Sequence, residues 1–218
     1  MKQVIQIRCK NNKKSQKVEI GSTLFDIFSA FDLKMTHGPV SARVNNKVEG
    51  MHYRVYNSKD VEFLDMTSSS GSRAYTRTLF FVLCKAVQDI YPATDVVIDI
   101  PVSNGFYVDI RQGRPVVDED VNIIRRRMQE IIDARMPIRR FTVPTEEAVA
   151  LFQEKGDVEK VKLLKTSGSI YTTYYKIGDY VDYYYGTLLT NTSQLYLFGL
   201  EKYYDGMLLR IPSLKNPD

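Results

Sequence analysis

The chain has 218 residues, of which 44% are hydrophobic, so it can bury a sizeable core in one or two domains and lacks the composition of a disordered protein. Lysine and arginine exceed aspartate and glutamate by 30 − 26 = 4, a surplus that permits a nucleic-acid partner without indicating one. No stretch approaches the roughly 20 apolar residues of a membrane-spanning helix, so we expect no membrane partner and a cytoplasmic protein. Cys9 and Cys84 have no metal-binding spacing, which predicts two reduced thiols.

Residues 1–66 predict short strands around one helix. Residues 3–8 and 16–20 alternate apolar and polar side chains on either side of a polar turn, which is typical of a hairpin. Ser22 or Thr23 can cap the helix that follows. Three further strands are expected, at residues 40–44, 47–48 and 60–64. A hairpin, a helix and more strands in about 65 residues indicate a β-grasp, ubiquitin-like fold.

Two stretches in this region carry a family resemblance. Gly21-Ser-Thr-Leu-Phe-Asp26 enters the helix, and Ala42-Arg-Val-Asn-Asn-Lys-Val48 forms a strand pair. Both resemble the TGS domain, a small β-grasp module of threonyl-tRNA synthetases, certain GTPases and stringent-response enzymes. The resemblance implies a domain that binds a ligand or RNA rather than one that catalyses. That family usually has glycine in place of Asn46, and asparagine tolerates the left-handed turn conformation expected there.

Lysines cluster in the turn of the predicted hairpin. Lys10, Lys13 and Lys14 are candidate contacts for the phosphates of RNA. The same residues are more typical of an ordinary solvated turn, which is the favoured interpretation, and phosphate contact is the alternative.

Residues 67–72, Thr-Ser-Ser-Ser-Gly-Ser, predict a linker, and residues 73–210 a second domain that is separable from the first. A helix over 72–91 opens that domain, with an apolar stripe at helical spacing. Arg77 and Phe81 lie four residues apart and therefore on one face of this helix. Residues 211–218 are rich in proline and polar side chains, so we expect them to begin a linker to a further domain.

The second domain is expected to alternate strands and helices. Strands are predicted at residues 96–100, 104–110, 138–143, 170–177, 180–185 and 194–201, and helices at 118–135 and from 145 until Gly156, with a helix or strand at 158–164. Asp118 can cap the first of these helices. Ten of the fifteen tyrosines fall between Tyr171 and Tyr204, where they either pack against neighbouring strands or form a stacking surface for bases.

Ordered motifs in this domain resemble the editing domain of threonyl-tRNA synthetase, which is shared with alanyl-type editing proteins. They are Asn104-Gly-Phe-Tyr-Val-Asp109, Thr145-Glu-Glu-Ala-Val-Ala-Leu-Phe152 and Tyr180-Val-Asp-Tyr-Tyr-Tyr-Gly186. The resemblance implies an α+β fold, so the whole chain is expected to be α+β: a β-grasp TGS module followed by an editing-like module.

The resemblance also locates the place of the editing site. The family carries an H-x-x-x-H pair and a C-x-x-x-H pair, which align with Arg77 and Phe81, and with Tyr184 and Leu188. None of these four is a plausible zinc ligand, so we expect no metal and no catalytic residues there. Polar family positions are matched by Lys160 and Asp182. Arg77 is therefore expected to pair with Asp182, to reach solvent, or to hold an anionic ligand.

Three functional hypotheses follow. Some bacterial nucleoside kinases carry a similar TGS-plus-editing-like region, so the leading hypothesis is a non-catalytic accessory region of a uridine or nucleoside kinase. The chain lacks a P-loop motif, so ATP and Mg²⁺ are expected only in a further C-terminal kinase domain, with no cofactor in this region. A small nucleotide or RNA is the other expected partner. The alternatives are an aminoacyl-tRNA deacylase that works without the usual ligands, and a tRNA- or RNA-binding module.

Overall fold

The computed structural model describes residues 3–35, 37–92, 94–102 and 105–212. They form two compact units, Met1–Met136 with Thr187–Asp218, and Pro137–Gly186. The chain is α+β, as expected. The predicted domain boundary at 67–72 does not coincide with this division and stays a prediction. Most of the predicted linker at 211–218 lies outside the described residues.

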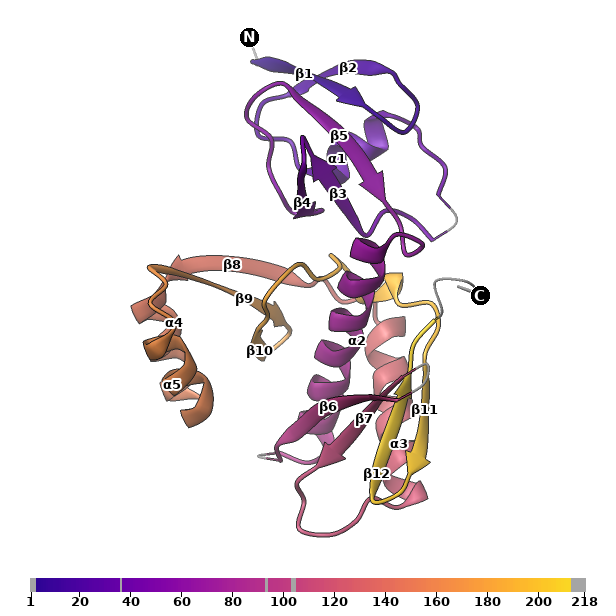
Figure 1. Cartoon of the computed structure of the whole chain (residues 1–218), viewed down its shortest axis with the longest axis vertical. Helices are drawn as coiled ribbons and strands as arrows, with labels where there is room; N and C mark the ends of the chain where they lie inside the picture. The colour runs from indigo at the N-terminus through magenta and orange to yellow at the C-terminus, as the bar shows by residue number, and fades with distance from the viewer. Residues whose placement is uncertain (1–2, 36, 93, 103–104, 213–218) are drawn as a thin grey trace. The chain divides into compact units, whose positions relative to one another are not determined.

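The first unit begins with the predicted β-grasp. Its elements are β1 (Val4–Cys9), β2 (Ser15–Glu19), α1 (Leu24–Ala30), β3 (Ser41–Val44), β4 (Lys47–Gly50) and β5 (Lys59–Leu64). The sheet order is β2-β1-β5-β3-β4, with β1 and β5 parallel and the other neighbours antiparallel (Figure 1). Apolar residues of the sheet and of α1, among them Ile7, Leu24, Ile27 and Phe63, form one buried core.

Local signals explain the β-grasp elements. Thr23 caps α1, because its hydroxyl accepts a hydrogen bond from Asp26 N at 3.1 Å while the Asp26 carboxylate accepts one from Thr23 N at 2.9 Å. One detail of the prediction is wrong. Asn45, with φ +53°, holds the left-handed position of the β3–β4 turn rather than Asn46, because the turn needs only one such residue and asparagine supplies it at the first place.

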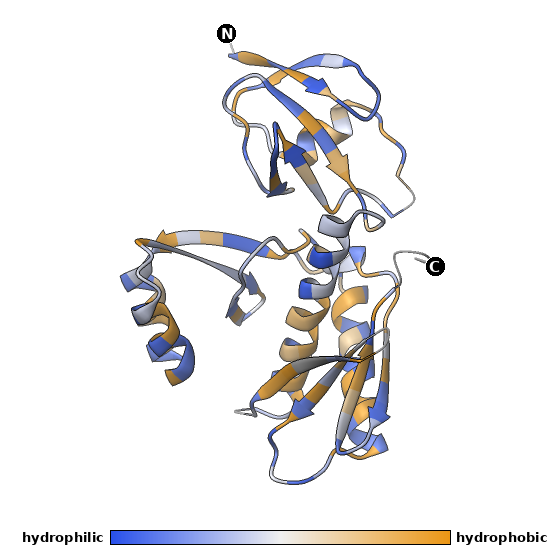
Figure 2. Ribbon diagram, in the orientation of Figure 1, coloured by the Kyte–Doolittle hydropathy of each residue, from blue (hydrophilic) through white to orange (hydrophobic). Residues whose placement is uncertain are grey.

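The rest of the first unit is a four-stranded sheet with two long helices. It comprises α2 (Ser69–Ile90), β6 (Val96–Val102), β7 (Gly105–Ile110), α3 (Asp118–Asp133), the 3₁₀ helix η1 (Thr192–Gln194), β11 (Gly199–Tyr203) and β12 (Gly206–Arg210). The strand order is β11-β12-β7-β6. Both helices contact the sheet and each other, and Figure 2 shows hydrophobic residues along α2, α3 and these strands.

Beyond shifts of one or two residues at element ends, the structure differs from the sequence predictions at α2, at the start of α3 and in the C-terminal strands. Helix α2 begins at Ser69 instead of Ser72, because the Ser68 hydroxyl accepts a hydrogen bond from Gly71 N at 3.0 Å and caps it early, so the predicted linker is partly helical. Helix α3 is preceded by Val117, whose N–H donates to the Asp120 carboxylate at 2.9 Å, so Asp118 is not the cap. The strand predicted at 194–201 is replaced by η1 and β11, and β12 was not predicted.

The second unit is a small three-stranded sheet with two helices packed on it. Its elements are β8 (Arg139–Pro144), α4 (Thr145–Glu154), α5 (Val158–Thr166), β9 (Tyr171–Ile177) and β10 (Tyr180–Tyr183). The antiparallel sheet has the order β10-β9-β8. Helices α4 and α5 pack on it through Ala148, Phe152 and Val161, together with Val181 of the sheet. Residues 158–164, for which helix and strand were left open, are therefore helical.

Candidate functional site

The two stretches that align with the editing site's first and last ligands meet in the first unit. Arg77 Nη1 on α2 lies 3.5 Å from the Thr187 carbonyl oxygen, to which it donates. One residue further along the helix, the Thr78 hydroxyl accepts a hydrogen bond from Leu189 N at 2.9 Å. The segment after the second unit therefore runs along the same turn of α2 that carries Arg77, so Arg77 and Leu188 belong to adjoining stretches of backbone.

Two of the side chains at these positions, Phe81 and Leu188, cannot bind a metal. Phe81 is fully buried and Leu188 is 1% exposed, so both are core residues. Across the described parts of the chain, no group of three or more histidine, cysteine, aspartate or glutamate side chains is placed to hold a metal ion. Apolar side chains occupy two of the three places where the resembling family has imidazoles, and phenylalanine and leucine offer no acid, base or nucleophile.

The other two polar candidates meet inside the second unit. Lys160 Nζ on α5 lies 2.8 Å from a carboxylate oxygen of Asp182 on β10 and 2.8 Å from Asp157, which caps α5. The Tyr180 hydroxyl donates to the other Asp182 oxygen at 2.9 Å. Burial lowers the pKa of Lys160, but the Asp182 and Asp157 carboxylates outweigh it, so the pKa is raised above its ordinary value.

This charge cluster is a structural link rather than a catalytic group. A lysine with a raised pKa stays protonated at neutral pH and cannot act as a general base. Asp182, which was expected to pair with Arg77, has a cationic partner within its own unit. Arg77 belongs to the other unit, and its predicted ion pair with Asp182 stays a prediction, as does the assignment of Tyr184 to the vacated site.

A second feature of this unit was not anticipated from the sequence. Arg139 of β8 and Lys176 of β9 are opposite each other in the antiparallel register, and both are exposed. The next pair on the same face, Phe141 and Tyr174, is stacked, with ring centroids 5.2 Å apart and an interplanar angle of 17°. Like charges opposite each other repel unless an anion lies between them. The strands' alternation could have indicated this pair, but its register required the structure.

The remaining candidates lie on the surface of the β-grasp. Lys10, Lys13 and Lys14 occupy the β1–β2 turn and are exposed, and Lys13 has φ +60°. Their position suits either interpretation left open by the sequence, so their contact with phosphate stays a prediction.

The tyrosines of the second unit include both buried and exposed side chains. Tyr175 is 1% exposed, whereas Tyr171 and Tyr185 are 64% and 89% exposed.

Comparison of the sequence with known proteins identifies similar proteins. No family model matches the chain. The threonine–tRNA ligase of Clostridium kluyveri is 30% identical over 193 residues, which are 88% of this chain and 30% of the relative. This chain is similar to one part of a threonine–tRNA ligase. The enzyme of the same name from Acetivibrio thermocellus is 29% identical over 181 residues, 83% of this chain and 28% of that protein. The threonine–tRNA ligase of Syntrophotalea carbinolica is 30% identical over 204 residues, which cover 88% of this chain and 32% of that protein.

The similarity to threonine–tRNA ligases supports the TGS and editing-like resemblance, and it spans about 30% of the length of these relatives. It supports the alternative, a module related to tRNA editing or tRNA binding, better than the leading hypothesis of a kinase accessory region. The kinase domain, with its ATP and Mg²⁺, stays a prediction. Among the helices that the structure describes, none combines the length and hydropathy that crossing a bilayer requires.

Proposed function

We propose that this chain is a tRNA-binding region that does not carry out the hydrolytic step of editing. The observation that carries the proposal is the similarity to threonine–tRNA ligases along 83–88% of the chain, combined with Phe81 and Leu188 as buried core residues. A protein that keeps a tRNA-associated scaffold but fills its reaction site with apolar side chains retains binding and loses chemistry. We place the protein in the cytoplasm, where tRNA is charged and used.

The β8–β9 pair is the surface that we assign to the RNA backbone. Arg139 and Lys176 are opposed cations at one end of a sheet face, and a phosphate between them would relieve their repulsion. Backbone contact of this kind is independent of sequence and depends strongly on salt.

The test measures binding of fluorescently labelled tRNA by anisotropy over a range of salt concentrations. Replacing both cations, Arg139→Ala with Lys176→Ala, should weaken binding and reduce the slope of log Kd against log salt by about two, one for each lost phosphate contact. Lys34→Ala is the matched control, because Lys34 is exposed in the other unit, and it should leave the slope unchanged. Equal losses in the double variant and the control would contradict the assigned surface.

Hydrolysis is measured with aminoacylated tRNA in the same preparations. We expect the chain to release the amino acid no faster than buffer alone, because it binds without a catalytic group. Deacylation that is proportional to protein concentration would overturn the non-catalytic part of the proposal and favour the deacylase hypothesis. Absence of salt-dependent tRNA binding would overturn the binding part.

A further inference from the structure

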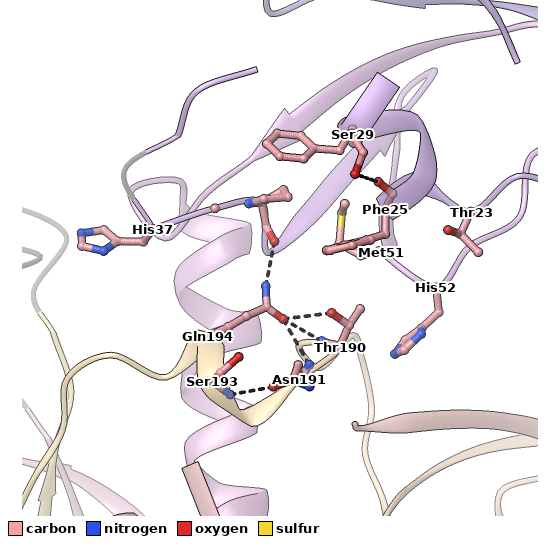
Figure 3. A pocket seen from close by; sticks show the side chains of 13 residues that line it. Thr23, Phe25, Ser29, His37, Met51, His52, Thr190, Asn191, Ser193 and Gln194 are labelled. Carbon is pink, nitrogen blue, oxygen red and sulfur yellow. Dashed lines mark hydrogen bonds between the residues drawn. The ribbon is translucent and has the colours of Figure 1, made fainter. Parts of the chain in front are cut away.

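A cavity of about 690 Å³ lies in the first unit, away from the positions that align with the editing site. One wall comes from the β-grasp, with Phe25, Phe28 and Met51, and the other from the η1 segment, with Asn191 and Gln194 (Figure 3). The volume is within the range of about 300–1,000 Å³ that is typical of small-molecule sites. The two walls are about 140 residues or more apart in sequence, and no hypothesis above assigns them a role.

The described lining of this cavity combines apolar side chains with polar ones and contains no lysine, arginine or carboxylate. Its hydrophobic part comprises Phe25, Phe28, Met51 and Pro39, and its other described members are glycine, hydroxyl, amide and imidazole side chains. No lysine, arginine, aspartate or glutamate is among the described residues that line it. A phosphate or another fully charged group inside the cavity would lose its hydration without an ionic partner, so the ligand that fits is neutral.

The polar wall is held rigidly. Gln194 Oε1 accepts hydrogen bonds from the N–H and the hydroxyl of Thr190, at 3.1 and 3.0 Å, while its Nε2 donates to the Pro39 carbonyl at 2.9 Å. Asn191 Nδ2 donates to the Arg135 carbonyl at 2.8 Å. Each amide nitrogen carries a second hydrogen beyond the one that it uses here, so each can still donate to a ligand. The two side-chain amides are therefore hydrogen-bond donors at fixed positions, and they lose little conformational entropy when a ligand binds.

The apolar wall offers a ring for stacking. Phe25 is 50% exposed, whereas Leu24 and Ile27 of the same helix are fully buried and Phe28 is partly buried. A half-exposed phenylalanine beside a methionine presents a flat, polarisable surface. Aromatic floors of this kind combined with amide donors recognise planar heteroaromatic rings, whose faces are apolar and whose edges accept hydrogen bonds.

We propose that this cavity binds a nucleobase, stacked on Phe25 and hydrogen-bonded through its edge by the Asn191 and Gln194 amides. Because no lysine or arginine is among the described residues that line the cavity, we expect any phosphate of the ligand to stay outside it, so the moiety bound is a nucleoside. The base can come from a free nucleoside or from an unpaired nucleotide of an RNA. The inference does not depend on the proposed function, because the cavity and the β8–β9 cations belong to different units.

The test titrates the whole chain with adenosine, uridine and ribose, followed by ¹H–¹⁵N NMR. We expect saturable shifts with a base-bearing nucleoside, centred on the amides of Phe25, Met51 and Asn191, and none with ribose. Phe25→Ala should weaken binding about tenfold, within the range expected for the loss of one base–aromatic stack. Tyr56→Ala is the matched control, because Tyr56 is an exposed β-grasp ring (58%) that does not line the cavity, and it should change affinity less than twofold, or about 0.4 kcal/mol.

A second variant and a second ligand complete the test. Ser193→Trp places a large ring on an exposed lining residue and should abolish the shifts by filling the cavity. A short single-stranded RNA that binds much more tightly than adenosine, and is weakened by Phe25→Ala, identifies RNA as the source of the base, whereas equal affinity identifies a free nucleoside. No saturation by any base-bearing ligand up to about 10 mM, shifts by ribose, or equal losses in Phe25→Ala and Tyr56→Ala would overturn the proposal. Loss of tRNA binding in the Arg139→Ala and Lys176→Ala variant, with adenosine binding intact, separates the two proposals.

Discussion

Lys160 of α5 and Asp182 of β10 form an ion pair of 2.8 Å in which the carboxylate is almost completely buried. Asp157 contacts the same ammonium at 2.8 Å, so one lysine joins the start of α5 to the edge of the three-stranded sheet. Both residues match polar positions of the editing family. Here they bind each other and thereby hold α5 against the sheet.

Lys160→Met should lower the free energy of unfolding by about 1–3 kcal/mol, because it leaves two carboxylates, one of them buried, without their cation. Adding Asp182→Asn should recover part of this loss, since the stranded charge is removed. Urea denaturation measures both variants. Lys165→Met, an exposed lysine of the same helix, is the control and should have little effect. Strictly additive effects of the two changes would show that the residues are not coupled.

Asp120 should make the protein sensitive to acid. Its buried carboxylate accepts hydrogen bonds from both terminal nitrogens of Arg114, at 2.7 and 2.8 Å, and from the Tyr91 hydroxyl at 2.6 Å. The Arg114 guanidinium, against the opposing effect of burial, holds the pKa of Asp120 well below its usual range. Between that pKa and the unfolded value of about 3.9, the unfolded state binds more protons, so the stabilisation is complete above about pH 4 and falls as the pH is lowered.

Asp120→Asn should therefore lower the free energy of unfolding by about 2–3 kcal/mol at pH 7, and the difference from the original chain should narrow below about pH 4. Denaturation curves recorded from about pH 2 to about pH 7, a range that includes the pKa of an ordinary carboxylate, measure this difference in the free energy of unfolding. Asp118→Asn on the same helix is exposed and should cost less than about 1 kcal/mol. A difference that is constant over the whole range would contradict the assignment.

Gly71 should tolerate no side chain. A Cβ atom there would lie 1.8 Å from the Asp65 carbonyl oxygen and 2.7 Å from Val40 Cγ2, because the first turn of α2 packs directly on the chain that leaves β5. Gly71→Ala should destabilise the chain by about 3 kcal/mol or more, since backbone has to move. Thermal unfolding measures the loss. Ser69→Ala, two residues earlier and exposed, should change the midpoint little; comparable losses in both would refute the close contact.

The first unit should bind no zinc at the positions that align with the editing ligands. Phe81 and Leu188 are buried and apolar, and neither can coordinate a metal. Elemental analysis of a tag-free preparation, after incubation with zinc and dialysis, should give far less than one equivalent. One equivalent of zinc that is lost on mutating Arg77 would contradict this prediction. Zinc that is lost only on mutating Cys9, Cys84, His37 or His52 would belong to a different site and leave the prediction standing.

Local patterns in the sequence were sufficient for most of the fold. The β1–β2 hairpin, the capped helix α1 and the apolar stripe of α2 all follow from periodicity and capping, which act within a few residues and need no tertiary partner. The expectation that Arg77, Phe81, Tyr184 and Leu188 provide no metal ligands rests on residue type alone and stays a prediction.

Tertiary structure decided which residues meet. Asp182 pairs with Lys160 because α5 packs on the sheet that carries β10, and no periodicity in the sequence encodes that choice. The first turn of α2 packs so closely on the chain after β5 that a Cβ atom at Gly71 would lie 1.8 Å from the Asp65 carbonyl oxygen, a contact that the sequence pattern does not show. The cavity joins Phe25 to Asn191 across more than 160 positions of the chain. Such contacts form only when helices and strands that are distant in sequence pack against each other, so local sequence patterns do not encode them.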